Sequence, residues 1–276
     1  MGRKIRLVLM VLLLVVFCAA GSVVAFTFLR YEAEDKVYEQ AAEEFIRRTD
    51  NCDRTGEDTG SVGEDSMGEG STEEGNMAVS MSGSADRPPF EVDFEKLLEQ
   101  NDDVMGWLYC EGTKINYPVV QGDDDEFYLS HNYKREYQKS GSIFIEVLNR
   151  PGFADSNTVI YGHQMDNQSM FGALSNWAEQ DYYEEHPVMW LLTPETDYQV
   201  VLFSGYITAA LSDTYTVFTG PCDQLEEYLQ RCVQQSNFKA DVELGVNDKY
   251  VTFSTCTYEF ENARYILHGK LVPIEK

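Results

Sequence analysis

The 276-residue sequence is poor in cysteine and in basic residues. Its six cysteines are too few in so long a chain for a disulfide scaffold, and no C-x-x-C spacing supports a zinc site. Lysine and arginine number 21 against 47 aspartates and glutamates, a net charge of −26. Because such a chain cannot neutralise phosphates, no nucleic-acid partner is expected. The acidic run 123–126 lacks the spacing of a calcium loop, and neither a metal nor a cofactor is expected.

Charge is also absent from residues 7–29, and the first 30 residues contain four basic residues but no acidic one. As a helix, these 23 residues would be about 35 Å long, enough to cross a bilayer. A cleaved secretory signal is the alternative, but its apolar core is usually only about 7–15 residues long. Three basic residues precede the run and three acidic ones follow it, namely Arg3, Lys4, Arg6 and Glu32, Glu34, Asp35. The positive-inside rule therefore predicts a single-pass anchor in the cell membrane, with a cytoplasmic N-terminus and an extracellular remainder.

Composition predicts three parts of the chain. Residues 1–30 are the cytoplasmic tip and the transmembrane anchor. Residues 31–87 form an acidic stalk, helical over 31–48 and then rich in glycine, serine, aspartate and glutamate, a composition typical of disorder. Residues 88–276 contain enough apolar residues for one sizeable core and are expected to form the folded domain.

The folded part is expected to be mostly β, barrel-like, with helical insertions. A short helix follows a possible cap at Asp93, and apolar spacing predicts two further helices over 169–177 and 223–234. Eight strand-like runs are 106–110, 117–121, 141–146, 158–161, 188–192, 198–207, 250–256 and 264–272.

The end of the run 250–256 carries the strongest chemical signal. Alternation places Val251, Phe253 and Thr255 on a core face and Tyr250, Thr252, Ser254 and Cys256 on a hydroxyl-lined face suited to a pocket. A hairpin through 259–263 would return Arg264 to the side of Cys256. A thiol becomes a good nucleophile when a nearby cation or imidazole favours its ionised form, and arginine can stabilise an oxyanion. The non-catalytic alternatives are a cysteine buried in the core and an ordinary arginine at a strand edge.

Four histidines compete for the role of base. His131 and His186 have polar neighbours and are most simply surface residues. His268 lies in the last strand on the side of Arg264 and is a rival. His163 follows a strand and a glycine, in the sequence Tyr161-Gly162-His163, and strand ends are where catalytic groups are usually presented. His163 is therefore favoured.

Several stretches, in order, resemble the class B sortases, the membrane-anchored cysteine transpeptidases of Gram-positive bacteria. They are GWL at 106–108, NYPVVQG at 116–122, GSIF at 141–144, NTVIYGH at 157–163, MFG at 170–172, TFSTC at 252–256 and ARY at 263–265. Two positions depart from the family pattern. Phe253 stands where the family has leucine, and Asp125 where many relatives have asparagine.

The resemblance implies an eight-stranded β-barrel with added helices and assigns roles by position. Cys256 resembles the nucleophile, His163 the general acid and base, and Arg264 the stabiliser of oxyanion and substrate. Tyr161, Ser254, Thr255 and Asp125 match positions near the substrate groove.

The implied reaction cleaves a C-terminal sorting signal of the S/N-P-x-T-G/N type after threonine, through a thioester on Cys256. The surface protein is then transferred to an amine of the cell-wall cross-bridge or of a pilin lysine. Wall L,D-transpeptidases have their arginine two residues past the cysteine, not eight, and papain-like hydrolases place the cysteine before the histidine. The non-enzymatic alternative is a tethered extracellular binding or adhesin domain built on a non-catalytic barrel.

Overall fold

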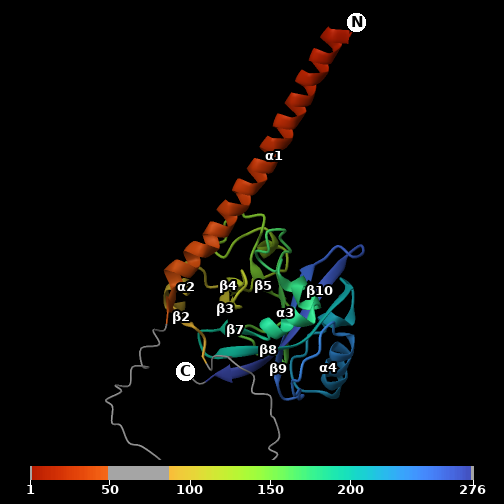
Figure 1. Cartoon of the computed structure of the whole chain (residues 1–276). Coiled ribbons are helices and arrows are strands. Elements are labelled where there is room, and N and C mark those ends of the chain that lie inside the picture. Colours follow the sequence, from red (N-terminus) through yellow and green to blue (C-terminus); the bar gives the residue numbers. More distant parts are fainter. Residues whose placement is uncertain (1, 49–86, 275–276) are drawn as a thin grey trace, which may run out of the picture.

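The computed structural model describes residues 2–48 and 87–274, and at its centre is a closed barrel of eight strands (Figure 1). The order around the barrel is β10-β8-β7-β3-β4-β5-β6-β9. The β4–β5 and β6–β9 pairs are parallel, and the other neighbours are antiparallel. The strands are β3 (Val104–Tyr109), β4 (Asn116–Val120), β5 (Ile143–Ile145), β6 (Asn157–Tyr161), β7 (Val188–Leu192), β8 (Asp197–Ala209), β9 (Lys249–Cys256) and β10 (Ala263–Ile274). Each of the eight predicted runs overlaps one of them, and the expected mostly β barrel is confirmed.

The helices lie outside the barrel. They are α1 (Gly2–Phe45), α2 (Phe94–Gln100), α3 (Gln180–Glu185) and α4 (Asp223–Gln235), with the 3-10 turns η1 (Phe127–Leu129), η2 (Leu174–Ala178) and η3 (Asp213–Tyr215). The predicted cap of α2 is confirmed, because the Asp93 carboxylate accepts a hydrogen bond from the Lys96 backbone N–H at 3.2 Å. Helix α4 matches the helix predicted over 223–234 to within one residue, whereas α3 was not predicted.

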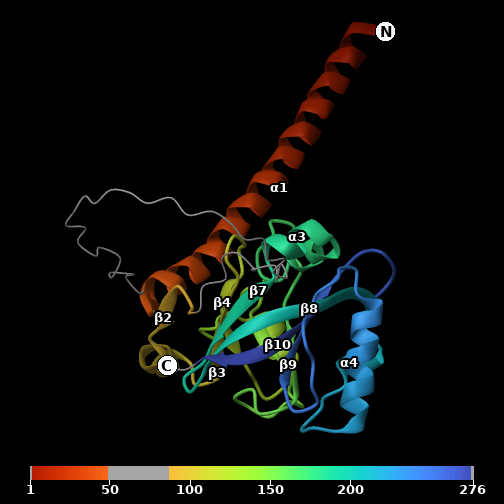
Figure 2. The same ribbon diagram turned by 60° about the horizontal axis from the view of Figure 1, so that its bottom comes forward.

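Two apolar clusters stabilise the barrel, one inside it and one on its outer wall. Val251 and Phe253 of β9 are fully buried in the inner cluster, as their alternation predicts. The opposite face of β9 carries Tyr250 into the outer cluster, which α4 covers from the side (Figure 2). The predicted hydroxyl-lined pocket face is therefore only partly open, because α4 seals all of it except the end near Ser254 and Cys256.

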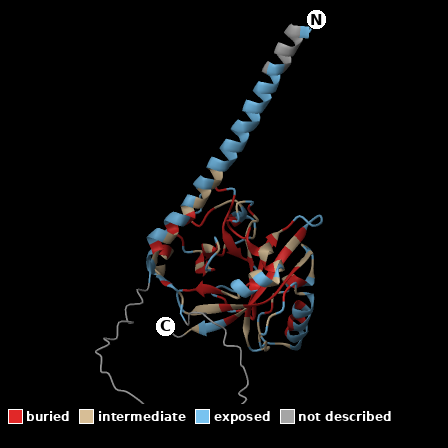
Figure 3. Ribbon diagram, in the orientation of Figure 1, coloured by how far each residue is buried: buried red, intermediate tan, exposed pale blue. Residues whose placement is uncertain are grey.

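Helix α1 joins the barrel to the N-terminal apolar run without a break. Residues 12–29 of this helix are exposed, and within the described residues it is the one helix long and apolar enough to cross a membrane (Figure 3). Its C-terminal part packs on the barrel, where Tyr38, Ala41 and Phe45 are buried in the inner core cluster. The chain then forms β1 (Ile46–Arg48), which pairs with β2 (Phe90–Val92).

The division of the chain at residue 88 stays a prediction, but the structure adds residues 38–46 to the packed core. The predicted helix over 31–48 ends three residues early, because residues 46–48 pair as a strand. The stretch expected to be a disordered stalk lies, from residue 49 to 86, outside the described residues.

The predicted helix over 169–177 is wrong. Gln168 and Met170 have φ values of 67° and 53°, a left-handed backbone that an α-helix cannot include. Met170, Phe171, Leu174 and Trp177 are buried as their spacing suggests, but a looped segment ending in η2 carries them. The apolar spacing thus predicted correctly which residues are buried, but it predicted the wrong type of secondary structure.

Packing of α1 on the barrel should contribute measurably to the free energy of unfolding. Phe45 is fully buried, with its ring edge-on to Tyr133 at 6.3 Å between centroids. Phe45→Ala should lower the free energy of unfolding by about 3–5 kcal/mol, measured by urea denaturation of the full chain in detergent with tryptophan fluorescence. The control is Glu44→Ala, which removes only the exposed Lys96–Glu44 ion pair and should cost less than about 1 kcal/mol. Equal effects would contradict a packed α1.

Candidate active site

Two parallel neighbouring strands carry His163 and Cys256 to the same edge of the barrel. In the β6–β9 pair Tyr161 lies opposite Ser254, and both strands end there or shortly after. Continuing both chains by two residues sets His163 level with Cys256. Parallel pairing thus brings together two residues that are 93 positions apart in the sequence.

Strand β10 brings Arg264 to the other side of the cysteine. Arg264 is the direct partner of Cys256 in the antiparallel β9–β10 pair. Side chains in such pairs have Cβ atoms about 4.5–5.5 Å apart, so the guanidinium can reach any group bonded to the sulfur. Its Nη1 donates to the Ala263 carbonyl oxygen at 3.0 Å. The hairpin expected to return Arg264 beside Cys256 is therefore present.

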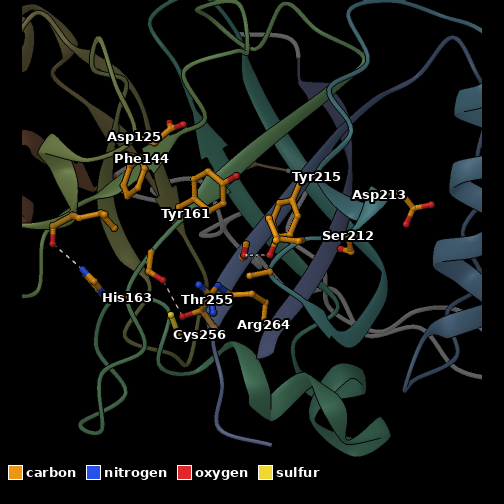
Figure 4. A pocket seen from close by; sticks show the side chains of 15 residues that line it. Asp125, Phe144, Tyr161, His163, Ser212, Asp213, Tyr215, Thr255, Cys256 and Arg264 are labelled. Atoms are coloured by element: carbon orange, nitrogen blue, oxygen red, sulfur yellow. Dashed lines mark hydrogen bonds between the residues drawn. The ribbon is translucent and has the colours of Figure 1, made fainter. Parts of the chain in front are cut away.

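These three residues line one cavity of about 690 Å³ (Figure 4). Figure 4 shows Cys256, Arg264 and His163 at one end and Asp125 at the other, with the rings of Phe144 and Tyr161 between them. The remaining lining residues are Leu129, Gly162, Ala210, Leu211, Ser212, Asp213, Tyr215, Ser254 and Thr255. All seven site residues named from the sequence line this cavity.

A backbone carbonyl orients the His163 ring. Nε2 of His163 lies 2.7 Å from the Leu129 carbonyl oxygen, and this bond is drawn in Figure 4. Because a carbonyl oxygen only accepts, Nε2 must carry the proton and Nδ1 is left to exchange one. Within the part of the chain that the structure describes, no hydrogen bond joins His163 to Cys256. Both residues instead line the same cavity.

Cys256 is half-buried and lines the cavity, which distinguishes it from other cysteines. Cys110 and Cys232 are buried, and burial raises the pKa of their thiols to about 12 and about 11. Cys222 is partly exposed at the start of α4, and Cys18 is exposed on α1. Cys52 lies outside the described residues. Cys256 thus combines access with a neighbouring arginine and histidine.

The hydroxyls of Ser254 and Thr255 tie the end of β9 to neighbouring segments of the cavity wall. The Thr255 Oγ1 donates to the Gly162 carbonyl oxygen at 2.8 Å, which ties β9 to the residue before His163. The Ser254 hydroxyl pairs with the Tyr215 hydroxyl at 2.9 Å. Thr255 is 2 % exposed, so its hydroxyl serves the fold as well as the cavity wall.

The far end of the cavity is acidic. The Tyr161 hydroxyl donates to Glu146 Oε2 at 2.6 Å, and the Val147 backbone N–H donates to Asp125 Oδ1 at 2.8 Å. Burial raises the pKa of the Asp125 carboxyl to about 6, and the adjacent Glu146 carboxylate contributes to the same rise. Burial and Glu146 also raise the pKa of Tyr161. The carboxyl group of Asp125 thus lies beside the carboxyl group of Glu146.

The other histidines lie away from the cavity. His268 is 1 % exposed in the outer cluster, its Nδ1 3.1 Å from the Thr252 hydroxyl and its Nε2 3.2 Å from the Tyr206 hydroxyl. Burial lowers the pKa of His268 to about 3, so the ring is neutral. His131 and His186 are half-buried and stack on Phe127 and Tyr182.

Sequence reasoning missed the cavity wall formed by residues 210–215. Tyr215 lies beside Tyr161 in Figure 4, and the two rings stack with 6.1 Å between centroids. Burial raises the pKa of Tyr215, and the nearby Arg264 charge partly offsets this. The segment is a polar loop after β8, and its composition resembles that of any surface loop. Across the described ranges no group of three or more His, Cys, Asp or Glu side chains could hold a metal ion.

Comparisons with known proteins identify the family of this chain. The sortase domain family model matches residues 108–272. Sortase B of Listeria monocytogenes is 39% identical over 184 residues, which are 65% of this chain and 73% of the relative. Sortase B of Staphylococcus aureus is 32% identical over 184 residues, 66% of this chain and 75% of that protein.

The chain belongs to the class B sortases. The crystal structure of Staphylococcus aureus sortase B superposes with a TM-score of 0.62 at 31% identity, covering 66% of this chain and 87% of that one. The Clostridium perfringens sortase B structure gives 0.60 at 34% identity, covering 65% and 100%. Sortases are cysteine transpeptidases that anchor proteins to the cell wall, and this chain has their eight-stranded barrel.

The acidic end of the cavity predicts a pH-dependent stability. The pKa of Asp125 is raised from 3.8 to about 6, so the folded state binds a proton more readily between those values. The stability that this group contributes is therefore present at low pH and is lost as the pH rises through about 6. Because asparagine resembles the protonated form, Asp125→Asn should raise the melting temperature near pH 7.5 and leave it little changed near pH 4.

The matched control is the neighbouring Asp124. Backbone N–H groups of Phe127 and Glu126 lower the pKa of its carboxyl, so the stability that it contributes is present at neutral pH and lost on acidification. Asp124→Asn should therefore lower the melting temperature at pH 7.5. Melting curves from pH 4 to 8 measure both variants, and a shift of the same sign in both would contradict the assignment.

Proposed function

We propose that this class B sortase cleaves a sorting signal after threonine and transfers the protein to an amine, with Cys256, His163 and Arg264 as the reacting groups. The observation that supports this most is the strand pairing that sets Arg264 opposite Cys256 and His163 level with it. In this proposal the Cys256 thiol gives its proton to His163 Nδ1, and the resulting thiolate attacks the threonine carbonyl. A tetrahedral intermediate forms with its negative charge on the former carbonyl oxygen.

Arg264 then stabilises that oxyanion, since its guanidinium keeps its charge at any working pH. His163 donates a proton to the leaving amine through Nδ1, because Nε2 is engaged with Leu129. Collapse of the intermediate breaks the peptide bond and leaves a thioester on Cys256. The incoming amine attacks the thioester and gives a proton to His163 Nδ1, and the Cys256 thiolate leaves as the new amide forms.

The sorting signal is proposed to be of the S/N-P-x-T-G/N type and to lie along the cavity towards Tyr161, Ser254, Thr255 and Asp125. Solved relatives include a Staphylococcus aureus sortase B–substrate complex and a sortase B complex with triglycine, with TM-scores of 0.62 and 0.61. They support a peptide donor and an amine acceptor. The acceptor is proposed to be a cell-wall cross-bridge amine or a pilin lysine.

The proposed location is the cell membrane. Helix α1 crosses it once, with Arg3, Lys4 and Arg6 on the cytoplasmic side and the barrel outside. Residues 1–30 then form the tip and anchor, residues 31–87 the connecting part and residues 88–276 the catalytic domain. This topology places the barrel on the side of the membrane where wall amines are found.

Substitution of the three reacting groups tests the mechanism. Cys256→Ala should abolish cleavage of fluorogenic peptides carrying S-P-x-T-G, N-P-x-T-N or L-P-x-T-G, and His163→Ala and Arg264→Ala should each lower kcat by about 10²–10³. His268→Gln, in the outer cluster, is the control and should retain activity in folded protein. Full cleavage by Cys256→Ala would contradict the thioester mechanism, and no cleavage by the unmodified chain would favour a non-catalytic barrel that binds proteins.

Thiol labelling tests the access to Cys256 without a substrate. At pH 7 a methanethiosulfonate should modify Cys256 much faster than the buried Cys110 and Cys232, whose thiols burial keeps protonated. Peptide mass mapping over time distinguishes the cysteines, with partly exposed Cys222 as the internal reference. A Cys256 rate no higher than that of Cys222 would contradict an activated thiol.

A further inference from the structure

One turn of α1, residues 34–38, lies where the anchor helix meets the barrel. Within this turn Glu34, Asp35 and Tyr38 all contact loops of the barrel. These loops are the two segments that hold His163. One follows His163 in the chain, and the other carries the carbonyl that orients its ring.

The loop after His163 has a strained backbone that needs outside support. Its residues Gln168 and Met170 have φ values of 67° and 53°, unfavourable for side chains with a Cβ. The loop closes on itself where the Phe171 N–H donates to the His163 carbonyl oxygen at 3.0 Å. A change in the loop conformation would therefore move the backbone of His163.

Helix α1 supplies that support through Asp35. The Asn167 Nδ2 donates to Asp35 Oδ2 at 3.0 Å. The Asn167 Oδ1 in turn accepts from the Ser169 backbone N–H at 3.1 Å and from its hydroxyl at 2.7 Å. Asn167 is thus a bridge between α1 and the strained part of the loop.

A second contact reaches the same loop through two tyrosines. The Met170 N–H donates to the Tyr117 hydroxyl at 2.9 Å, which satisfies the backbone at a left-handed residue. The Tyr117 ring lies edge-on to Tyr38 of α1, with 5.1 Å between centroids. Tyr38 is 4 % exposed, so this contact is part of the packed interface.

The same turn of α1 holds the other segment. The Tyr38 hydroxyl donates to the Gly141 carbonyl oxygen, and the Ser140 N–H donates to Glu34 Oε2 at 3.2 Å. Next to them the Ser142 N–H donates to the Tyr128 carbonyl oxygen at 2.9 Å. Tyr128 precedes Leu129, whose carbonyl accepts from His163.

We propose that residues 34–38 of α1 are a positioning element for His163, which act through Asn167 on one side and through residues 128–142 on the other. The inference rests on the proposed function, in which His163 transfers the protons. Its consequence is that the membrane anchor is also part of the catalytic framework. Misplacing a catalytic group by about 1 Å can reduce the rate roughly 10²-fold, so loss of this support should appear in kcat.

The test uses the full chain in detergent micelles and a fluorogenic sorting-signal peptide. Asp35→Ala and Asn167→Ala should each lower kcat roughly tenfold, because His163 is displaced for part of the time, and should change KM less than twofold. Asp35→Asn keeps an oxygen that can accept from Asn167 and should restore at least half of kcat. Tyr38→Phe, which removes only the hydroxyl, should lower kcat further when combined with Asp35→Ala.

Lys114→Ala is the matched control. Lys114 Nζ lies 3.3 Å from the same Asp35 Oδ2 but does not belong to either loop. This variant removes one of the two contacts that Asp35→Ala removes, so it should lower the melting temperature no more than Asp35→Ala does and leave kcat within twofold of the unmodified chain. An equal loss of kcat in Lys114→Ala would show general loosening of α1 and would overturn the proposal.

Failure of this inference differs from failure of the proposed function. Unchanged kcat in Asp35→Ala, with an inactive Cys256→Ala, would overturn the positioning role and leave the thioester mechanism standing. Full turnover by Cys256→Ala would overturn both. A loss in Asp35→Ala that Asp35→Asn does not restore would also count against the hydrogen bond to Asn167.

Discussion

Strand β9 is hydrogen-bonded on both sides, and the geometry of the site depends on this double pairing. Its parallel partner β6 leads to His163, and its antiparallel partner β10 begins next to Arg264. Neither pairing can slip by one residue, because Val251 and Phe253 would then leave the inner core. Hydrophobic burial along the strand therefore fixes the register at its end, where Cys256 lies.

The cavity has opposite electrical character at its two ends. Arg264 lies beside Cys256, whereas Asp125 and Glu146 lie together at the far end. Any molecule bound along this axis would meet a cation at one end and carboxyl groups at the other. Asp125 thus adds a titratable group to the cavity at the end away from the thiol.

Much of the barrel could be predicted from the sequence for identifiable reasons, whereas Tyr161, Thr255 and Asp125 were placed at the cavity only through the family resemblance. Alternation in β9 and β10 is set by burial, and Asp93 acts through a local cap, so both signals lie within a few residues. The packing of α1 and the position of Tyr215 depend on partners far along the chain, and no local pattern reports them. The segment 169–177 was misassigned because loop residues can be buried at helical spacing.

Helix α1 runs unbroken from the apolar run to Phe45, and this continuity has a geometric consequence. Successive residues of an α-helix are rotated by about 100°, at 3.6 residues per turn. One residue inserted just before Glu34 would therefore turn the whole barrel by that angle about the helix axis, relative to the apolar segment. Helix α1 thus fixes which side of the apolar segment the cavity mouth faces.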